Sequence, residues 1–232
     1  IQRFTWKFGN GQTQNIENPS PIRYDSFTQF KAITLIAETT IGCVDSSILE
    51  VELYASPSIE LKILTDEQCL EDNLFKTNNT VAIPIGTVSS SLIWGDGNST
   101  LDTSNAEHSY SVYGDFDVRL IAQSDKGCLK EDTVSIRVNP MPEAKIGVND
   151  SVQCLEGNEF IWEDQSSVAE GTFESEWKHR NDTYTEDFSF SRDAAGEYTV
   201  NLQVTSDKGC LSTIAKTVEV LEMPEAIIIS DT

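Results

Sequence analysis

The sequence has few basic residues, few histidines and no long apolar run. Lysine and arginine number 16 against 38 aspartates and glutamates, so the net charge is −22. That charge repels nucleic-acid phosphates and anionic lipids, which argues against both as partners. No apolar stretch approaches the roughly 18–20 residues of a membrane helix, so membrane insertion is not expected. The two histidines, His108 and His179, lack metal-ligand spacing and a triad pattern, so we expect neither an enzyme nor a zinc site.

A sustained 3.6-residue apolar period with helix caps is also absent. Apolar and polar residues instead alternate, with many β-branched and aromatic side chains, in the segments 116–124, 133–140 and 197–206. This period of two is typical of half-buried strands. Asn-Gly, Asp-Gly and Lys-Gly pairs supply turns between such segments. The sequence therefore predicts an all-β protein.

An internal repeat organises these strands. The pair Gly-Cys occurs three times, and a proline follows each of its cysteines 14 positions later. The landmarks are Cys43 with Pro57, Cys128 with Pro142, and Cys210 with Pro224. The period of 82–85 residues fits one small seven-strand sandwich per repeat. We expect a truncated domain containing only its C-terminal strands at 1–56, whole domains at 57–141 and 142–223, and the start of another at 224–232.

The second repeat contains a recognisable set of motifs. WGDG at 94–97, HSY at 108–110 and YGDFDVRL at 113–120 resemble the signature of the polycystic-kidney-disease (PKD) domain. Partial copies are WKFGNG at 6–11 and AAGEYTVNL at 194–202. The resemblance implies tandem immunoglobulin-like β-sandwich domains of the PKD type, joined like beads on a string by short proline-containing linkers.

The resemblance also implies a function. Repeats of this type with a Gly-Cys motif are similar to those of very large Bacteroidota surface proteins, such as gliding-type adhesins and exported filaments delivered by type IX secretion. This similarity implies that the chain is a non-catalytic shaft or spacer at the extracellular cell surface. Its partners would be neighbouring repeats, other copies in a filament, and a surface or glycan ligand. The alternative is an accessory or carbohydrate-binding module of a secreted hydrolase.

The third repeat departs from the signature at WKHRND (177–182), which lacks the glycine turn.

Two cysteines in each whole repeat indicate disulfide bonds formed in an oxidising compartment. Cys69 and Cys154 each follow a Gly-Cys pair by 26 residues. The favoured pairing joins Cys69 to Cys128 and Cys154 to Cys210, and places the partner of Cys43 outside the sequence. The first and last hairpins of a simple sandwich lie at opposite ends, so a bond within a repeat needs a kinked first strand or a long first loop that folds back. A bridge between neighbouring repeats, from Cys69 to Cys210, is therefore an alternative, as are a Cys43–Cys69 bond and free thiols.

A tryptophan recurs in each repeat, at Trp6, Trp94 and Trp177. An exposed row of aromatic rings would stack on sugars, but each sandwich needs a large core residue, and we expect these side chains in the cores. Trp162 is expected in a core for the same reason. His108 is expected to buttress a turn, as the resemblance implies.

Two further kinds of candidate site rest on short patterns. Asp96, Asn98 and Asp102 offer oxygen ligands for calcium, but no loop of alternating acidic residues with a closing glutamate surrounds them. We therefore expect them to form turns and expect no cofactor. Thr133 and Ser151 lie in Asp-Thr-Val and Asp-Ser-Val. The Bacteroidota resemblance implies that these two hydroxyls are candidates for O-glycosylation.

Overall fold

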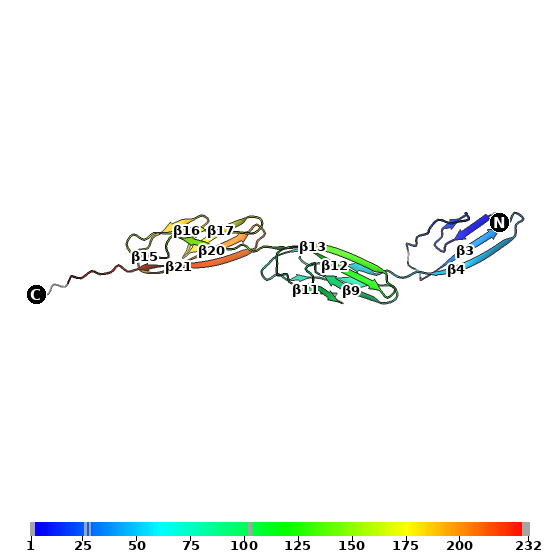
Figure 1. Ribbon diagram of the computed structural model, residues 1–232, viewed down its shortest axis with the longest axis horizontal. Coiled ribbons are helices and arrows are strands. Elements are labelled where there is room, and N and C mark those ends of the chain that lie inside the picture. Colours follow the sequence, from blue (N-terminus) through cyan, green and yellow to red (C-terminus); the bar gives the residue numbers. More distant parts are fainter. Residues whose placement is uncertain (1–2, 26, 28, 102–103, 229–232) are drawn as a thin grey trace. The chain divides into compact units, whose positions relative to one another are not determined.

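The computed structural model describes residues 3–25, 27, 29–101 and 104–228 (Figure 1). Strands and loops account for all of these residues, so none of the described segments is a helix that could cross a membrane. The all-β prediction is confirmed. Below, the first, second and third repeats are the predicted ranges 1–56, 57–141 and 142–223.

The first repeat contributes one antiparallel sheet in the order β2-β1-β3-β4. Its strands are β1 (Arg3–Lys7), β2 (Thr13–Gln14), β3 (Phe30–Glu38) and β4 (Val44–Glu52). β3 and β4 pair along their whole lengths, with Glu38 opposite Val44, so Cys43 lies in the tight turn between them. β4 forms one edge of this sheet.

The second repeat has a five-stranded sheet in the order β10-β9-β12-β13-β6 and two short pairs, β11-β7 and β5-β8. The strands of this repeat before the β12–β13 hairpin are β5 (Ser58–Glu60), β6 (Glu67–Cys69), β7 (Phe75–Lys76), β8 (Thr80–Ala82), β9 (Val88–Ile93), β10 (Ser99–Leu101) and β11 (Glu107–His108). The long hairpin consists of β12 (Gly114–Ser124) and β13 (Leu129–Asn139). β6 is parallel to the end of β13.

The third repeat has the same arrangement, with sheets β15-β21-β20-β17-β18 and β14-β16-β19. The strands of the second sheet are β14 (Ile146–Val148), β16 (Phe160–Asp164) and β19 (Phe188–Phe190). Those of the first are β15 (Val152–Cys154), β17 (Phe173–His179), β18 (Asp182–Tyr184), β20 (Gly196–Ser206) and β21 (Leu211–Leu221). β15 is parallel to the end of β21, as β6 is to β13.

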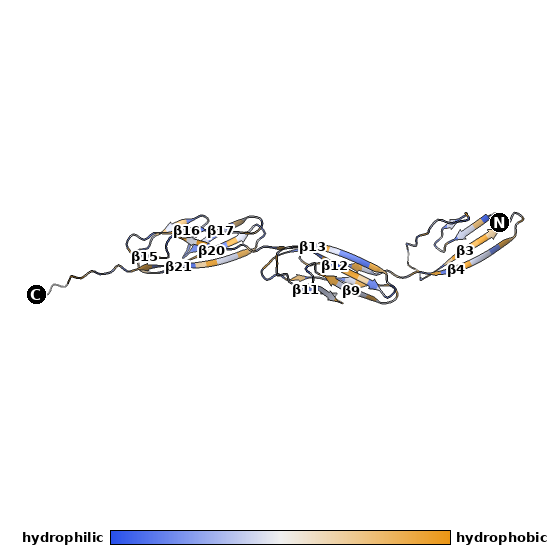
Figure 2. Cartoon of the chain, in the orientation of Figure 1, coloured by the Kyte–Doolittle hydropathy of each residue, from blue (hydrophilic) through white to orange (hydrophobic). Residues whose placement is uncertain are grey.

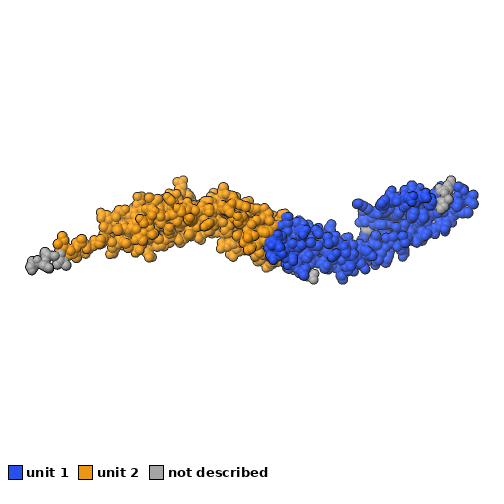
Figure 3. All heavy atoms as spheres, in the orientation of Figure 1, with its two compact units in different colours: residues 1–63, 77–106, 117–134 blue, residues 64–76, 107–116, 135–232 orange. Residues whose placement is uncertain are grey.

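The chain divides into two compact units whose borders differ from the predicted repeat boundaries (Figure 3). Unit 1 contains residues 1–63, 77–106 and 117–134. Unit 2 contains 64–76, 107–116 and 135–232, so the end of the second repeat that holds β6 and β11 is grouped with the third repeat. A disulfide and two ion pairs that link these segments, described below, lie within unit 2. The domain boundaries near 57, 142 and 224 stay predictions.

The core of the third repeat lies between its two sheets. Alternate residues of β20 point inward, and Val200, Leu202 and Val204 are fully buried against Trp162 and Trp177. The two indole rings meet edge to face with centroids 6.5 Å apart. Figure 2 shows hydrophobic and hydrophilic residues interspersed along the long strands, as this alternation requires. The period-two pattern read from the sequence therefore marks the core face.

The recurring tryptophans are largely core residues, as expected. Trp94, Trp162 and Trp177 are 1, 0 and 0% exposed, so Trp94 and Trp177 cannot form an exposed sugar-stacking row. Trp6 is half-buried and donates its indole N–H to the Ile16 carbonyl (3.1 Å). The three are not equivalent in register. Trp6 and Trp177 lie opposite Leu35 and Leu202, whereas Leu92, two residues before Trp94, lies opposite Leu120.

The strand that carries the recurring tryptophan is followed by a turn, and the third repeat forms this turn without a glycine. Gly9 and Gly95 have φ of +69° and +84°, and a side chain at either position would meet a backbone oxygen at 2.9 Å. The corresponding residue of WKHRND is Arg180, which adopts φ +56°. Left-handed backbone costs a non-glycine residue roughly 1–2 kcal/mol. The third repeat therefore keeps the turn at an energetic cost instead of losing it.

Candidate functional site

The turn that carries the Gly-Cys pair has the same hydrogen bonds in all three repeats. In the third repeat the backbone N–H of Cys210 donates to Ser206 Oγ (3.1 Å), and that of Gly209 donates to the Ser206 carbonyl (2.8 Å). The equivalent bonds run from Cys128 to Ser124 Oγ (3.0 Å) and from Cys43 to Thr39 Oγ1 (3.1 Å). We call residues 39–43, 124–128 and 206–210 the hairpin tips. A hydroxyl four residues earlier thus fixes each tip around its cysteine.

The other cysteine of a repeat ends a short strand that lies parallel to the last long strand. Cys69 ends β6 opposite Asn139 of β13, and the Leu70 N–H donates to the Asn139 carbonyl (2.9 Å). Cys154 ends β15 opposite Leu221 of β21, and the next N–H bonds to the Leu221 carbonyl at the same distance. We call Cys69 and Cys154 the strand cysteines. Each lies where the last long strand ends, remote from the hairpin tip at which that strand begins.

A six-residue motif builds the loop after each strand cysteine: QCLEDN at 68–73 and QCLEGN at 153–158. The Asn73 side chain donates to the Tyr110 carbonyl (2.8 Å) and accepts from the Tyr110 N–H (2.7 Å). Asn158 makes the equivalent pair of bonds, at 2.8 and 2.7 Å. Sequence reasoning noted the cysteine offset but missed this motif. Aligning the two repeats residue by residue around the strand cysteines would have found it.

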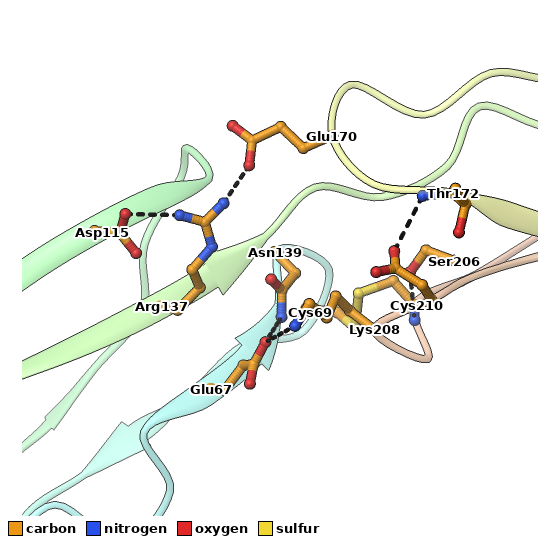
Figure 4. A network of polar contacts seen from close by, with 11 residues as sticks. Glu67, Cys69, Asp115, Arg137, Asn139, Glu170, Thr172, Ser206, Lys208 and Cys210 are labelled. Atoms are coloured by element: carbon orange, nitrogen blue, oxygen red, sulfur yellow. Dashed lines mark hydrogen bonds and ion pairs between the residues drawn. A yellow bond between two sulfur atoms is a disulfide. The ribbon is translucent and has the colours of Figure 1, made fainter.

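Cys69 and Cys210 form a disulfide that joins the second repeat to the third (Figure 4). Their Cα atoms are 5.5 Å apart although 141 residues separate them along the chain. Cys210 is buried and Cys69 is half-buried. Cys43, Cys128 and Cys154 are free within the described structure.

This pairing corrects the favoured prediction, which joined Cys69 to Cys128 and Cys154 to Cys210. β13 begins next to Cys128 and ends, eleven residues later, opposite Cys69. Because a strand rises about 3.3 Å per residue, the two cysteines lie more than about 30 Å apart. A disulfide needs Cα atoms within about 7 Å, so a bond within the repeat is ruled out by strand length. The bridge between repeats, the alternative left open, is the one present.

Charged side chains surround the bridge (Figure 4). Arg137 of β13 donates to Asp115 in its own repeat (2.7 Å) and to Glu170 in the loop before β17 of the third repeat. Lys208, in the hairpin tip beside Cys210, lies 3.6 Å from Glu67 of β6. Two ion pairs therefore cross the same junction as the disulfide.

The Glu67 carboxylate and the Arg137 guanidinium are each held in the charged form. The hydrogen bond from Asn139 (2.9 Å), followed by the positive charge of Lys208, lowers the pKa of Glu67. The hydrogen bond to Asp115 is the main reason that the pKa of Arg137 is raised. Because all these groups are accessible to solvent, salt screens them and each pair is individually weak. The covalent bond is therefore the strongest connection at this junction.

Equivalent residues form the junction between the first and second repeats, within unit 1. We call the groove lined by Tyr54, Ile85, Gly86, Asp125 and Lys126, with neighbouring residues, the first joint, and the groove lined by Asn139, Glu170, Gly171, Asp207 and Lys208, with Arg137, the second joint. A side chain at Gly86 or Gly171 would collide with the carboxylate of Asp125 or Asp207. In the first joint the Lys126 ammonium lies 5.7 Å from the Tyr54 ring centre.

His179 occupies the core position held by Trp94 in the second repeat and by Phe8 in the first. It is 4% exposed, stacks on Phe190, and its Nδ1–H donates to the Thr199 carbonyl (3.0 Å). Its Nε2 faces the Arg192 guanidinium, which donates to it. Burial, and then the charge of Arg192, lower the pKa of His179. His179 is thus a neutral core residue.

His108 lies on β11 opposite Phe75, with its ring edge-on to Tyr110 at 4.7 Å. It contributes to a strand pair and an aromatic contact next to the Asn73 loop, and its role in buttressing a turn stays a prediction.

The described calcium candidates, Asp96 and Asn98, lie in a turn, and the two glycan candidates lie on or next to a strand. Asp96 accepts hydrogen bonds from the backbone and side-chain N–H groups of Asn98 at 3.0 and 2.8 Å, while Asp102 lies outside the described residues. No three described His, Cys, Asp or Glu side chains gather as a metal site. Thr133 on β13 and Ser151 before β15 are exposed. Calcium binding and O-glycosylation stay untested predictions.

No family model and no curated protein sequence matches this chain. Among solved structures, the PKD1 domain of Vibrio anguillarum Epp is 30% identical and aligns over 37% of this chain and 99% of its own length, with a TM-score of 0.31. The PKD1 domain of the Vibrio cholerae metalloprotease PrtV is 22% identical over 37% of this chain and 98% of its own (TM-score 0.29). The N-terminal eight Ig domains of Down Syndrome Cell Adhesion Molecule are 11% identical and align over 97% of this chain and 33% of theirs, with a TM-score of 0.53. Together with the strand order above, the last similarity establishes that this chain consists of tandem immunoglobulin-like β-sandwich domains.

Proposed function

We propose that this chain is a non-catalytic segment of PKD-type repeats that forms the shaft or spacer of a large extracellular surface protein. The observation that supports this most directly is the Cys69–Cys210 bond, which ties one repeat to the next instead of stabilising a single domain. A bond of that kind serves mechanical continuity. Burial of Trp94 and Trp177 removes the obvious aromatic platform for sugars.

The same bond supports a location outside the cytoplasm. Structural disulfides persist in oxidising compartments and are rare where thiols are kept reduced. The net charge of −22 would keep a long array soluble. The gliding-type adhesins and exported filaments of Bacteroidota, delivered by type IX secretion, are the class of parent protein we propose. Neighbouring repeats, and other copies within a filament, would be its partners.

A replacement experiment in the producing cells tests the spacer role. An epitope tag is placed beyond the repeats in the parent protein, and its distance from the cell envelope is measured by immunogold electron microscopy. Deleting residues 57–223 is expected to bring the tag closer while the protein still labels on intact cells. Inserting two unrelated inert sandwich domains is expected to restore the distance and any attachment that depends on reach.

Two outcomes contradict the proposal. If the tag labels only permeabilised cells, the extracellular location is wrong. If unrelated domains restore the distance but not attachment, although surface amounts are equal, then the repeats bind a ligand themselves and do not act only as a spacer.

A further inference from the structure

Each of the three free cysteines has the same local backbone geometry as either Cys69 or Cys210, the two residues of the disulfide. Cys43 and Cys128 belong to hairpin tips whose hydrogen bonds match those around Cys210. Cys154 is a strand cysteine in the same parallel register as Cys69. Their spacing and backbone geometry are therefore those of the two bonded residues.

The surroundings of Cys128 match as well. The first joint contains the same glycine and aspartate pair and the same tip lysine as the second. At the second joint β6, ending in its strand cysteine, covers the outer edge of β13. The corresponding edge of β4 near Tyr54 has no such parallel strand among the described residues. The first joint thus offers the tip cysteine and the strand edge, and what would complete it is one strand carrying a cysteine.

We propose that the Cys69–Cys210 bond is one member of a series, in which the strand cysteine of every repeat bonds to the tip cysteine of the next. Cys128 would then bond to a strand cysteine of the first repeat that precedes this sequence in the parent protein. Cys154 would bond to a tip cysteine in a repeat that follows it. Cys43 would bond to a strand cysteine one repeat earlier. The inference rests on the proposed function, because it assumes that the repeats continue in a longer chain.

The arrangement explains why each repeat has two cysteines that cannot reach each other. One connects it to the repeat before and the other to the repeat after. Each bond forms when two thiols lose two protons and two electrons. An oxidising thiol oxidoreductase, or another protein that carries a disulfide, accepts these electrons and protons, and its own disulfide is reduced to two thiols. A shaft built this way is covalently connected twice along its length: through the backbone and through a chain of bridges that bypasses most of each fold.

Peptide mapping of the parent protein, purified from the producing cells, tests this directly. Free thiols are first blocked by alkylation, and trypsin is then used without reduction. Trypsin separates four of the cysteines onto the peptides 63–76, 127–130, 146–178 and 209–216. The expected links are 63–76 to 209–216, with 127–130 joined to an upstream peptide and 146–178 joined to a Gly-Cys peptide downstream.

A parent carrying Cys154→Ser provides the matched control. The downstream Gly-Cys peptide should become alkylated, while the link between 63–76 and 209–216 should remain. Finding 146–178 linked to 209–216, finding 127–130 linked to 63–76, or recovering 127–130 and 146–178 fully alkylated from the parent would each overturn the series. These outcomes would leave the extracellular spacer role intact. Loss of surface labelling in the replacement experiment would instead remove that role.

Discussion

The Cys69–Cys210 bond predicts that most of two repeats is shielded from a stretching force. When the chain is pulled from its two ends, tension passes from Cys69 through the disulfide to Cys210, so the 141-residue segment that it closes carries no load. In the folded protein the two Cα atoms are 5.5 Å apart. A fully extended segment of that length spans about 500 Å at roughly 3.6 Å per residue. Reduction should therefore release about 500 Å of additional extension.

Single-molecule force spectroscopy measures this difference. Residues 1–232 are placed between two marker domains and pulled with and without a reducing agent. Under oxidising conditions only the residues outside the bridge should extend. The double variant Cys69→Ser/Cys210→Ser should reach the longer length in both conditions, and Cys128→Ser should behave like the parent sequence, because Cys128 lies in the same kind of tip but is unbonded.

Equal total extension with and without reduction would refute this reasoning, since it would mean that the bond does not lie in the load path. A second measurement is unfolding in denaturant. Closing a loop of this length reduces the entropy of the unfolded chain, and the chain-entropy relation gives about 5 kcal/mol for unfolding of the whole enclosed segment. Reduction should lower the unfolding midpoint without altering the strand content of the folded state.

Three substitutions test the cores and turns of individual repeats. Trp94→Ala removes a fully buried ring and should lower the free energy of unfolding of the second repeat by about 3–5 kcal/mol in urea titrations, whereas an unchanged midpoint would contradict the core assignment. Burial lowers the pKa of His179 from 6.5, so the unfolded chain binds a proton that the folded repeat excludes. The neutral His179 ring therefore makes its full contribution to the free energy of unfolding above pH 6.5, and this contribution is lost as the pH falls below 6.5. Thermal unfolding between pH 7.5 and 5 should show this loss, His179→Phe should reduce it, and an identical pH profile for the variant would disprove it. Arg180→Gly relieves left-handed backbone that costs roughly 1–2 kcal/mol and loses about 0.5–1 kcal/mol through the greater flexibility of glycine, so it should raise the thermal midpoint of the third repeat. A lower midpoint would argue against strain at this turn.

Local patterns were sufficient for much of the fold. The alternation in 197–206 predicted the inward face of β20, because side chains of a strand alternate between its two faces whatever the strand packs against. The Trp94 core position followed from the need of each sandwich for a large buried residue. Register was harder to predict, since the shift of Trp94 by two residues keeps it on the same face and leaves the alternation unchanged. The sequence also did not predict that the turn is kept at Arg180, because the strands on either side impose its conformation.

The sequence by itself determined the strand pattern, the period, and the places in each repeat where cysteines recur, because these depend on short-range spacing and on side-chain chemistry. Which cysteines meet was decided only by the tertiary structure. The parallel pairing of β6 with the end of β13 places Cys69 a full strand length from Cys128, and the third repeat brings Cys210 to the vacant end. Partner choice depends on which ends of two folded sheets come together. Spacing along the chain does not contain that information, and it led to the wrong pair.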